Sequence, residues 1–299
     1  KADLAMSDNA IKRASPLKRK RRTKAQIDEL REVIREVLEA DHPQSVRHVF
    51  YCVYSDTGLI EKTESGYNTV QAQLLKMRLS GEVPWTWVSD GTRWRIEPQT
   101  YSSVANAIEI TAHAYRRDLW ARTPAYCEIW CESDSIAATI VQETDPYNVP
   151  LLSSRGFSSR SFLYRSAQHI KAQNRPAFLY YVGDWDPSGK IIPENINKVL
   201  REHAPDADIA FERLLVTPEQ IENWRLPTKP PKKSTHSNGW KGGTVEAEAI
   251  PAKRTRKLVR EAIEKHLDMR EVSVIRVAEE SERSALFSLA RMHSAGAVQ

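Results

Sequence analysis

Three acidic side chains come directly after strand-like runs of the sequence. Glu132 follows the run 127–131, and Asp184 and Asp186 follow the longer apolar run 177–183. If the two strands are neighbours in a parallel sheet, the three carboxylates converge on one edge, where their repulsion is costly unless a cation neutralises it. Carboxylate oxygens suit Mg²⁺, which uses only a few protein ligands. The pattern therefore indicates a candidate Mg²⁺ site, with Mn²⁺ as a substitute ion.

Helix capping is the alternative explanation for part of this pattern. Asp186 precedes Pro187 and could cap the start of a helix, and residues 133–134 could cap a helix that begins after Glu132. Capping does not explain Asp184, nor why an acid ends both strands. From the pattern alone, both interpretations remain open.

Alternating strands and helices must position these acids. Helical patterns over 136–144, 160–174 and 187–204 separate the strand-like runs, which cover 127–131, 149–152, 177–183 and 208–216. A continuous apolar strand is expected where helices cover both faces of a parallel sheet. The pattern predicts a small doubly wound α/β domain with a mostly parallel sheet, in which ligands gather at the carboxyl ends of the strands.

The region before this domain has a different pattern. Apolar residues at helical spacing over 27–38, a helix capped by Ser45 and a third helix over 65–80 are followed by β-rich sequence around Asp90-Gly91, a strong hairpin signal. Three helices and a hairpin are typical of a winged-helix domain. Another small α+β domain is the alternative. We expect a basic arm at 1–23, the winged helix with a connector helix at 24–122, the α/β domain at 123–268 and a helical tail at 269–299.

Positive charge is concentrated near the start of the chain. Residues 11–27 hold eight Lys or Arg and no acid, whereas the chain as a whole has a net charge of only +5. Such a segment suits the neutralisation of phosphates, although a solubilising or targeting tail explains it equally well. The candidate DNA contacts are Arg19, Lys20, Arg21 and Arg22 in the arm, Gln71, Lys76 and Arg78 on the third helix, and Arg155, Lys232 and Lys233 in the α/β domain.

Cysteine usage and hydropathy exclude several classes of protein. The three cysteines, Cys52, Cys127 and Cys131, have no CxxC spacing, which argues against a disulfide framework or a zinc site and suits a reducing cytoplasm. No apolar run approaches the ~20 residues of a membrane span, and no apolar segment of a secretory signal follows the basic arm. We therefore expect a cytoplasmic protein without a membrane partner.

Several motifs resemble one family of DNA-cleaving proteins. Glu132 together with Asp184-Trp-Asp186 resembles the metal site of the Toprim domain of topoisomerases, primases and related nucleases. Residues 155–164 and 181–189 are similar to the Toprim region of the topoisomerase VI A subunit, whose superfamily includes the meiotic double-strand-break transesterase. Residues 45–51 are similar to the R-x-x-[FY]-Y motif of its winged helix. The resemblance covers about 24–268 and is greatest to lone A-subunit-like proteins of phages, plasmids and integrated elements.

This resemblance implies a function. Glu132, Asp184 and Asp186 would bind Mg²⁺, Tyr51 would attack the backbone of double-stranded DNA, and Arg47 would clamp a phosphate. It also implies a 5′-phosphotyrosyl link, a homodimer that joins the tyrosine of one subunit to the metal site of the other, and a nucleoid-associated protein of a prokaryote or its mobile element. The chain has no ATPase region, so a B-type ATPase partner would be a separate protein.

Two features keep other functions open. Ser133 stands where the family usually has a lysine, and a tyrosine in an apolar helix is more often a core residue than a nucleophile. The alternatives are a Toprim nuclease in which Mg²⁺ activates water without a covalent intermediate, and a non-catalytic DNA-binding or recombination accessory protein. Tyr54, three residues after Tyr51, is the competing tyrosine on the same helix.

Overall fold

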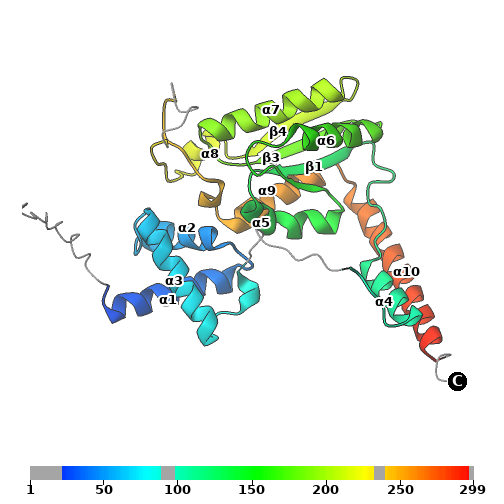
Figure 1. The fold of residues 1–299 in the computed structure, drawn as a ribbon, viewed down its shortest axis with the longest axis horizontal. Helices are drawn as coiled ribbons and strands as arrows, with labels where there is room; N and C mark the ends of the chain where they lie inside the picture. Colours follow the sequence, from blue (N-terminus) through cyan, green and yellow to red (C-terminus); the bar gives the residue numbers. More distant parts are fainter. Residues whose placement is uncertain (1–21, 89–97, 232–239, 296–299) are drawn as a thin grey trace, which may run out of the picture.

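A computed structural model describes residues 22–88, 98–231 and 240–295. The described chain combines many helices with one four-stranded, all-parallel sheet (Figure 1). The elements that precede the sheet are α1 (Lys24–Ala40), α2 (Val46–Thr57), α3 (Glu64–Ser80), the 3₁₀ helix η1 (Trp85–Trp87) and α4 (Val104–Ala114). The remaining elements are β1 (Tyr126–Cys131), α5 (Asp134–Thr144), η2 (Asp145–Tyr147), β2 (Leu151–Ser153), α6 (Arg160–Ala172), β3 (Ala177–Val182), α7 (Pro187–His203), β4 (Ile209–Leu215), α8 (Pro218–Asn223), η3 (Ala247–Ala249), α9 (Ala252–Glu264) and α10 (Met269–Ala295).

Local signals fix the first three helices. Thr23 and Gln26 form a capping box at the start of α1, and the Ser45 hydroxyl accepts a hydrogen bond from the backbone N–H of His48 in α2. Helices α2 and α3 end at Gly58 and Gly81, whose φ angles of 66° and 81° belong to the left-handed region that favours glycine. The three predicted helices are therefore confirmed, with ends within a few residues of those expected.

The segment after α3 differs from the predicted hairpin. Pro84 begins a 3₁₀ turn, and the backbone N–H of Trp87 donates to the Pro84 carbonyl at 3.2 Å. Val88 then forms one isolated parallel bridge with Gln44. The prediction of a first hairpin strand is thus wrong over η1. Its two tryptophans pack against different partners: Trp87 stacks on His42 at 4.5 Å between ring centroids, and Trp85 packs against Arg78. The Asp90-Gly91 turn lies outside the described residues.

The sheet has the order β2-β1-β3-β4. Helices α6 and α7 cover one face, and α5 and α9 lie against the other, as Figure 1 shows above and below the strands. All six residues of β1 are buried, and Cys127 and Cys131 are free core residues, as expected. The predicted α/β layering with a parallel sheet is confirmed.

One apolar core joins the first three helices to the sheet. Ile34 of α1, Val49 of α2 and Leu74 of α3 belong to the same buried cluster as residues of β1 and α9. An ion pair between the buried Arg256 and the half-buried Asp41 lies at this junction. The helical region and the sheet region therefore share a core across the boundary expected near residue 123.

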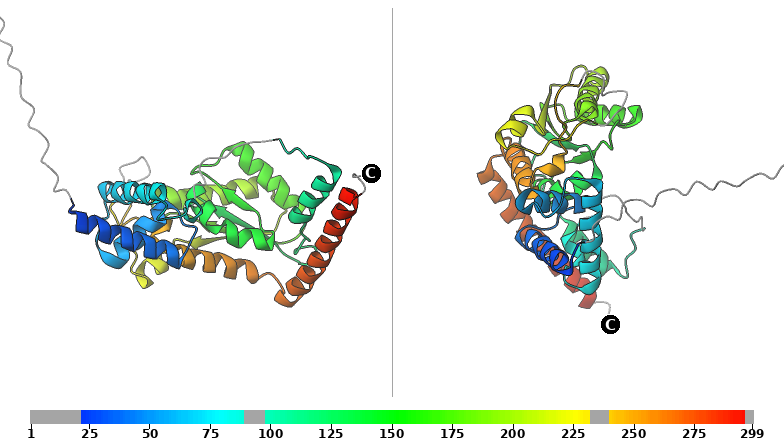
Figure 2. Two further views of the ribbon diagram at one scale, coloured as in Figure 1. Left: turned by 90° about the horizontal axis from the view of Figure 1, so that it is seen from below. Right: turned by 90° about the vertical axis from the view of Figure 1, so that its left-hand side faces the viewer.

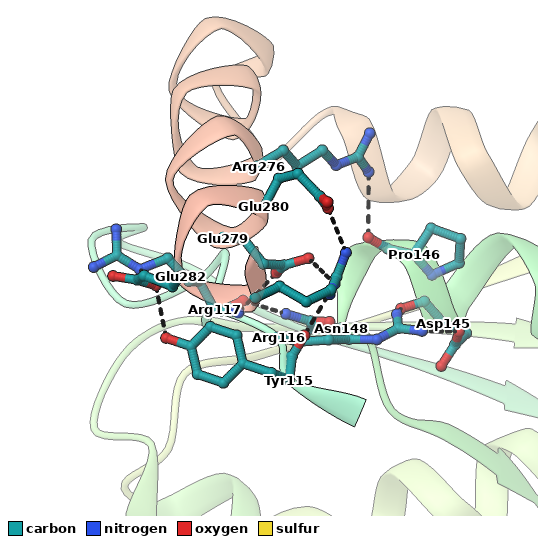
Figure 3. A network of polar contacts seen from close by, with 11 residues as sticks. Tyr115, Arg116, Arg117, Asp145, Pro146, Asn148, Arg276, Glu279, Glu280 and Glu282 are labelled. Atoms are coloured by element: carbon teal, nitrogen blue, oxygen red, sulfur yellow. Dashed lines mark hydrogen bonds and ion pairs between the residues drawn. The ribbon is translucent and has the colours of Figure 1, made fainter. Parts of the chain in front are cut away.

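Helices α4 and α10 form a pair that extends away from the sheet (Figures 1 and 2). The connector helix predicted from residue 101 to about 120 is shorter, because α4 ends at Ala114. Polar contacts hold α10 to the segment that follows α4: the Tyr115 hydroxyl donates to Glu282 at 2.7 Å and the Arg117 backbone N–H to Glu279 at 2.8 Å (Figure 3). No helix among residues 22–88, 98–231 and 240–295 is long and apolar enough to cross a membrane.

Candidate functional site

The two acid-bearing strand ends are neighbours. Strands β1 and β3 pair in parallel, with Cys131 opposite Val182. From β1 the chain continues to β2 at one edge of the sheet, and from β3 it continues to β4 at the other edge. Open α/β sheets bind ligands at such a switch point. The Glu132 carboxylate accepts a hydrogen bond from the Asp184 backbone N–H at 3.0 Å and one from the Tyr181 hydroxyl at 3.3 Å. The expected proximity of Glu132 and Asp184 is therefore confirmed.

Gly183 allows this close approach. A Cβ atom at this position would lie 2.7 Å from Oε2 of Glu132 and 2.6 Å from the ring of Tyr181, closer than real Cβ contacts. Any side chain at 183 would therefore force the Glu132 carboxylate, the Tyr181 ring or both to move. The glycine sets where the first acid lies relative to the second.

Asp184 lies in an acidic environment that raises its pKa. Its Oδ1 accepts a hydrogen bond from the Ala247 backbone N–H at 2.8 Å. Burial, with further repulsion from Glu248 and then Glu132, raises the pKa of the Asp184 carboxyl to about 8. Glu248 is itself buried, and burial raises its pKa as well. Glu248 was not among the residues expected from the sequence.

Asp186 serves as a helix cap. Its Oδ1 accepts a hydrogen bond from the Gly189 backbone N–H at 2.6 Å, and Pro187 occupies the first turn of α7. Ser133 likewise caps α5 by accepting from the Ile136 backbone N–H at 3.2 Å. Both capping contacts proposed from the sequence are thus present. Ser133 therefore caps a helix at the position where a lysine would supply a positive charge.

The carboxylates of Glu132, Asp184 and Asp186 suit a hard cation in their chemistry, and a cation bound by all three would have to replace some of their present hydrogen bonds. Glu132, Asp186 and Glu248 each raise the pKa of Asp184, which is the repulsion that a divalent cation would relieve. Several of their oxygens are engaged by backbone N–H groups. Within the part of the chain that the structure describes, no group of three or more His, Cys, Asp or Glu side chains is arranged to hold a metal ion.

Arg213 holds the acidic loop in place from β4. Its guanidinium donates to the carbonyl oxygens of Gly183 and Asp184, both at 3.2 Å, and to that of Gly189. It also lies over the rings of Tyr181 and Trp185, at 5.1 and 5.6 Å. Sequence reasoning missed this residue, although an arginine inside a strand that pairs with β3 was a usable signal.

Tyr51 lies in a separate pocket, which is joined to the acids through one short segment. Its side chain is 3% exposed, and its hydroxyl donates to Oε2 of Glu246 at 3.0 Å. Residue 247, the next along the chain, is the backbone donor to Asp184. Figure 1 shows the segment before α9 next to α2, and η3 contacts that helix. Tyr51 and the acids are therefore close within a single chain.

The Tyr51 pocket is rich in positive charge. We use this name for the cavity of about 480 Å³ lined by Arg47, Phe50, Tyr51, Lys62, Thr63, Glu64, Tyr67, Asn68, Lys229 and Glu246. Burial raises the pKa of the Tyr51 phenol, and Glu248 and Asp184 raise it further, whereas Arg47 lowers it. Burial next to Lys229 lowers the pKa of the Lys62 ammonium to about 8.

Arg47 lies where the motif predicts, one turn before Tyr51. Its guanidinium pairs with Oε2 of Glu246 at 2.6 Å and lies 5.2 Å from the ring centroid of Tyr67. Lys62 lies 5.4 Å from the ring centroid of Tyr51. Tyr54, the competing tyrosine, is not among the lining residues. The sequence identified Arg47 and Tyr51, but not Lys62, Lys229 or Glu246.

The candidate DNA contacts near α3 differ in their exposure and in the contacts that they make within the protein. Gln71 and Lys76 are exposed on α3, as expected. Arg22 donates to the Thr69 hydroxyl at 3.2 Å. The Arg78 guanidinium lies 4.0 Å from the ring centroid of Trp85 and donates to the Trp85 carbonyl at 3.3 Å, so a DNA contact by Arg78 would compete with this residue.

The remaining candidates lie in the α/β region or outside the described residues. Arg155 is exposed in the loop after β2 and pairs with Asp134 at 3.0 Å. Its φ of 48° is left-handed, next to Gly156, whose backbone N–H donates to the Glu132 carbonyl at 3.3 Å. The residues outside the described ranges are Arg19, Lys20, Arg21, Lys232 and Lys233.

Comparison with known proteins adds no assignment. No protein-family model matches the chain, and no curated protein matches it at a significant level.

Proposed function

We propose that this chain is a Mg²⁺-dependent DNA transesterase that resembles the topoisomerase VI A subunit, with Tyr51 as the nucleophile. The observation that carries the proposal is that the segment 246–248 contacts both parts of the site. Glu246 contacts Tyr51 and Arg47. The Ala247 backbone N–H donates to Asp184, and the charge of Glu248 raises the pKa of Asp184. A hydroxyl, a phosphate-binding cation and a carboxylate cluster within one connected site are the groups that phosphodiester transesterification requires.

In this proposal the winged helix, the Toprim domain and the basic arm have the roles that the resemblance implies. The arm and α3 bind double-stranded DNA mainly through phosphates, and Arg155 adds a contact beside the strand ends. The protein acts as a homodimer at the nucleoid, and any ATP-driven step belongs to a separate B-type partner. These assignments rest on the motifs in 45–51, 155–164 and 181–189.

Each residue of the site has a distinct task. Glu132, Asp184 and Asp186 would hold Mg²⁺, which polarises a phosphate and stabilises a leaving oxygen when bound. Arg47 holds the scissile phosphate, and Arg213 fixes the loop that bears the two aspartates. The Tyr51 oxygen forms a bond to phosphorus as the bond to the 3′ oxygen breaks, so the phenol loses its proton and the 3′ oxygen takes one up. The 5′-phosphotyrosyl link conserves the bond energy and allows religation.

The test is a cleavage assay on supercoiled plasmid with Mg²⁺, quenched with detergent and analysed with and without protease. Wild type and Tyr54→Phe should give covalent protein–DNA adducts. Tyr51→Phe removes only the hydroxyl and should give none at matched DNA occupancy. If Tyr51→Phe cleaves at the wild-type rate, Tyr51 is not the nucleophile.

A mixture of Tyr51→Phe and Asp184→Asn chains tests the dimer. If the tyrosine of one subunit acts with the acids of the other, the mixed dimer contains one intact site and regains adducts. If each tyrosine acts beside its own acids, as the contacts within this chain favour, the mixture stays inactive.

Two alternatives are separated by the same assay. Burial of Tyr51 and its raised pKa favour a Toprim nuclease in which Mg²⁺ activates water, which would nick DNA without adducts. The use of Ser133 as a helix cap favours a non-catalytic DNA-binding or recombination accessory protein, which would bind DNA without cleavage.

A further inference from the structure

Glu246 lines the Tyr51 pocket and is the acceptor on which three of its other lining residues converge. Its side chain is 14% exposed and receives three donors of different kinds. The Arg47 guanidinium and the Tyr51 hydroxyl contact its Oε2, at 2.6 and 3.0 Å, and the Lys229 ammonium contacts its Oε1. A guanidinium, an ammonium and a hydroxyl that converge on one compact anion are the donors that bind phosphate oxygens in proteins.

Basic side chains outnumber acidic ones around the cavity. Arg47, Lys62 and Lys229 line it, together with the carboxylates of Glu246 and of the exposed Glu64. The side chains of Arg47 and Lys229 are 42% and 31% exposed, so a ligand that enters the cavity can reach both. The cavity also falls in the size range of small-ligand sites.

We infer that the Tyr51 pocket is a phosphate-binding site and that the Glu246 carboxylate is its internal occupant, which a phosphate group must displace. The inference rests on the proposed function for the identity of the ligand, a phosphodiester of DNA. A phosphate that displaces the Glu246 carboxylate takes over its hydrogen bond from the Tyr51 hydroxyl, so the phosphate lies within reach of that hydroxyl.

A role of Glu246 as the proton acceptor of Tyr51 is the competing explanation. Positive charges on two sides stabilise the carboxylate in its charged form, which favours its role as a bound anion over a role as a base. The hydrogen bond from the Tyr51 hydroxyl also stabilises the neutral phenol. The observed arrangement is thus a resting state in which the nucleophile and its phosphate clamp are both occupied.

Competition makes a clear prediction for phosphate affinity. Glu246→Gln removes the competing charge while keeping the size of the side chain, so the Arg47 guanidinium loses its anionic partner and can pair with another anion. Glu64→Gln is the matched control, because it removes the same charge from the same cavity at an exposed residue. The control measures the general electrostatic effect.

The experiment titrates the full chain with inorganic phosphate by calorimetry, at constant ionic strength. Glu246→Gln should bind phosphate roughly tenfold more tightly than wild type, as expected when a charged hydrogen-bonding competitor is removed, and Glu64→Gln should change affinity at most a few-fold. Adding Arg47→Gln to Glu246→Gln should abolish the gain. If Glu246→Gln binds phosphate no more tightly than Glu64→Gln, the inference is wrong.

A second measurement needs no substitution at Glu246. Phosphate at millimolar concentration should raise the melting temperature of wild type, and should raise that of Arg47→Gln clearly less. Equal shifts in the two proteins would overturn the inference even if Glu246→Gln did not fold.

Neither measurement depends on DNA cleavage. If phosphate binding changes as predicted but no protein forms adducts, the phosphate site stands and the transesterase proposal fails. If wild type forms adducts, and Glu246→Gln loses them with unchanged phosphate affinity, Glu246 is the proton acceptor and the inference fails alone.

Discussion

His48 provides a sharp test of how the helical region meets the sheet region. Its side chain is 2% exposed, and its Nδ1 lies 3.0 Å from the Ser45 hydroxyl. Burial, together with the positive charge of Arg256, lowers the pKa of the imidazole to about 3. The ordinary pKa of a histidine in an unfolded chain is ~6.5. The folded protein therefore holds His48 neutral where the unfolded chain takes up a proton.

The sign and size of the effect on stability follow from this difference. The stabilisation is complete above pH 6.5 and is lost as the pH falls from 6.5 towards 3, since the unfolded state binds the proton first. At pH 5 the folded imidazole is still neutral, and proton uptake by the unfolded chain costs about 2 kcal/mol. Between pH 7.5 and pH 5, wild type should therefore lose about 2 kcal/mol more free energy of unfolding than His48→Gln.

Urea unfolding at the two pH values measures this difference of differences. Any constant effect of the substitution cancels, as do the contributions of the other titrating groups. His293→Gln, at an exposed histidine of α10, serves as the control. If wild type and His48→Gln lose the same stability on acidification, His48 is protonated in the folded protein, and the buried junction beside Arg256 is wrong.

Three further predictions concern the acidic loop and the arm. Arg213→Met should lower the free energy of unfolding, measured in urea, by about 3–5 kcal/mol, because several carbonyls lose a charged donor. Arg201→Met, which removes one such bond to a carbonyl, should cost about 1 kcal/mol. Equal losses would contradict the role of Arg213. Asp186→Asn should keep the helix cap and the melting temperature but weaken Mg²⁺ binding in calorimetry, whereas Asp186→Ala should also cost about 1 kcal/mol; unchanged Mg²⁺ affinity in both would leave Asp186 a cap alone. Deletion of 1–23 should reduce the slope of log K for DNA against log salt by several units, at ~0.9 per phosphate; an unchanged slope would make the arm a simple tail.

Local sequence signals predicted most of the fold. The hydroxyls of Thr23 and Ser45 cap the starts of α1 and α2 by accepting from backbone N–H groups three positions later, and Gly58 and Gly81 end α2 and α3. Nearby sequence therefore determines these boundaries. The continuous apolar run over β3 predicted a parallel strand covered by helices on both faces, because a strand buried on both faces has apolar residues at successive positions. The short helix α8 was not predicted, because its six residues carry no apolar period.

The parts of the site that sequence reasoning missed depend on contacts between distant residues. Tyr51 and Glu246 are 195 positions apart, and Arg213 reaches the acidic loop from another strand. Glu248 follows no strand and marks no motif, so only the fold brings it near Asp184. The error over η1 arose because the local sequence favours a strand, whereas the contacts of the tryptophans with other parts of the fold hold this segment in a 3₁₀ turn.

The pairing of α4 with α10 has a consequence for synthesis of the protein. Helix α4 is rich in Ala and Ile, and its main partner begins only at Met269. During translation α4 leaves the ribosome long before α10 exists, so its apolar side stays uncovered while the whole sheet region is made. Nascent chains that stop short of α10 should therefore be recognised by chaperones through α4, and completion of α10 should end that recognition.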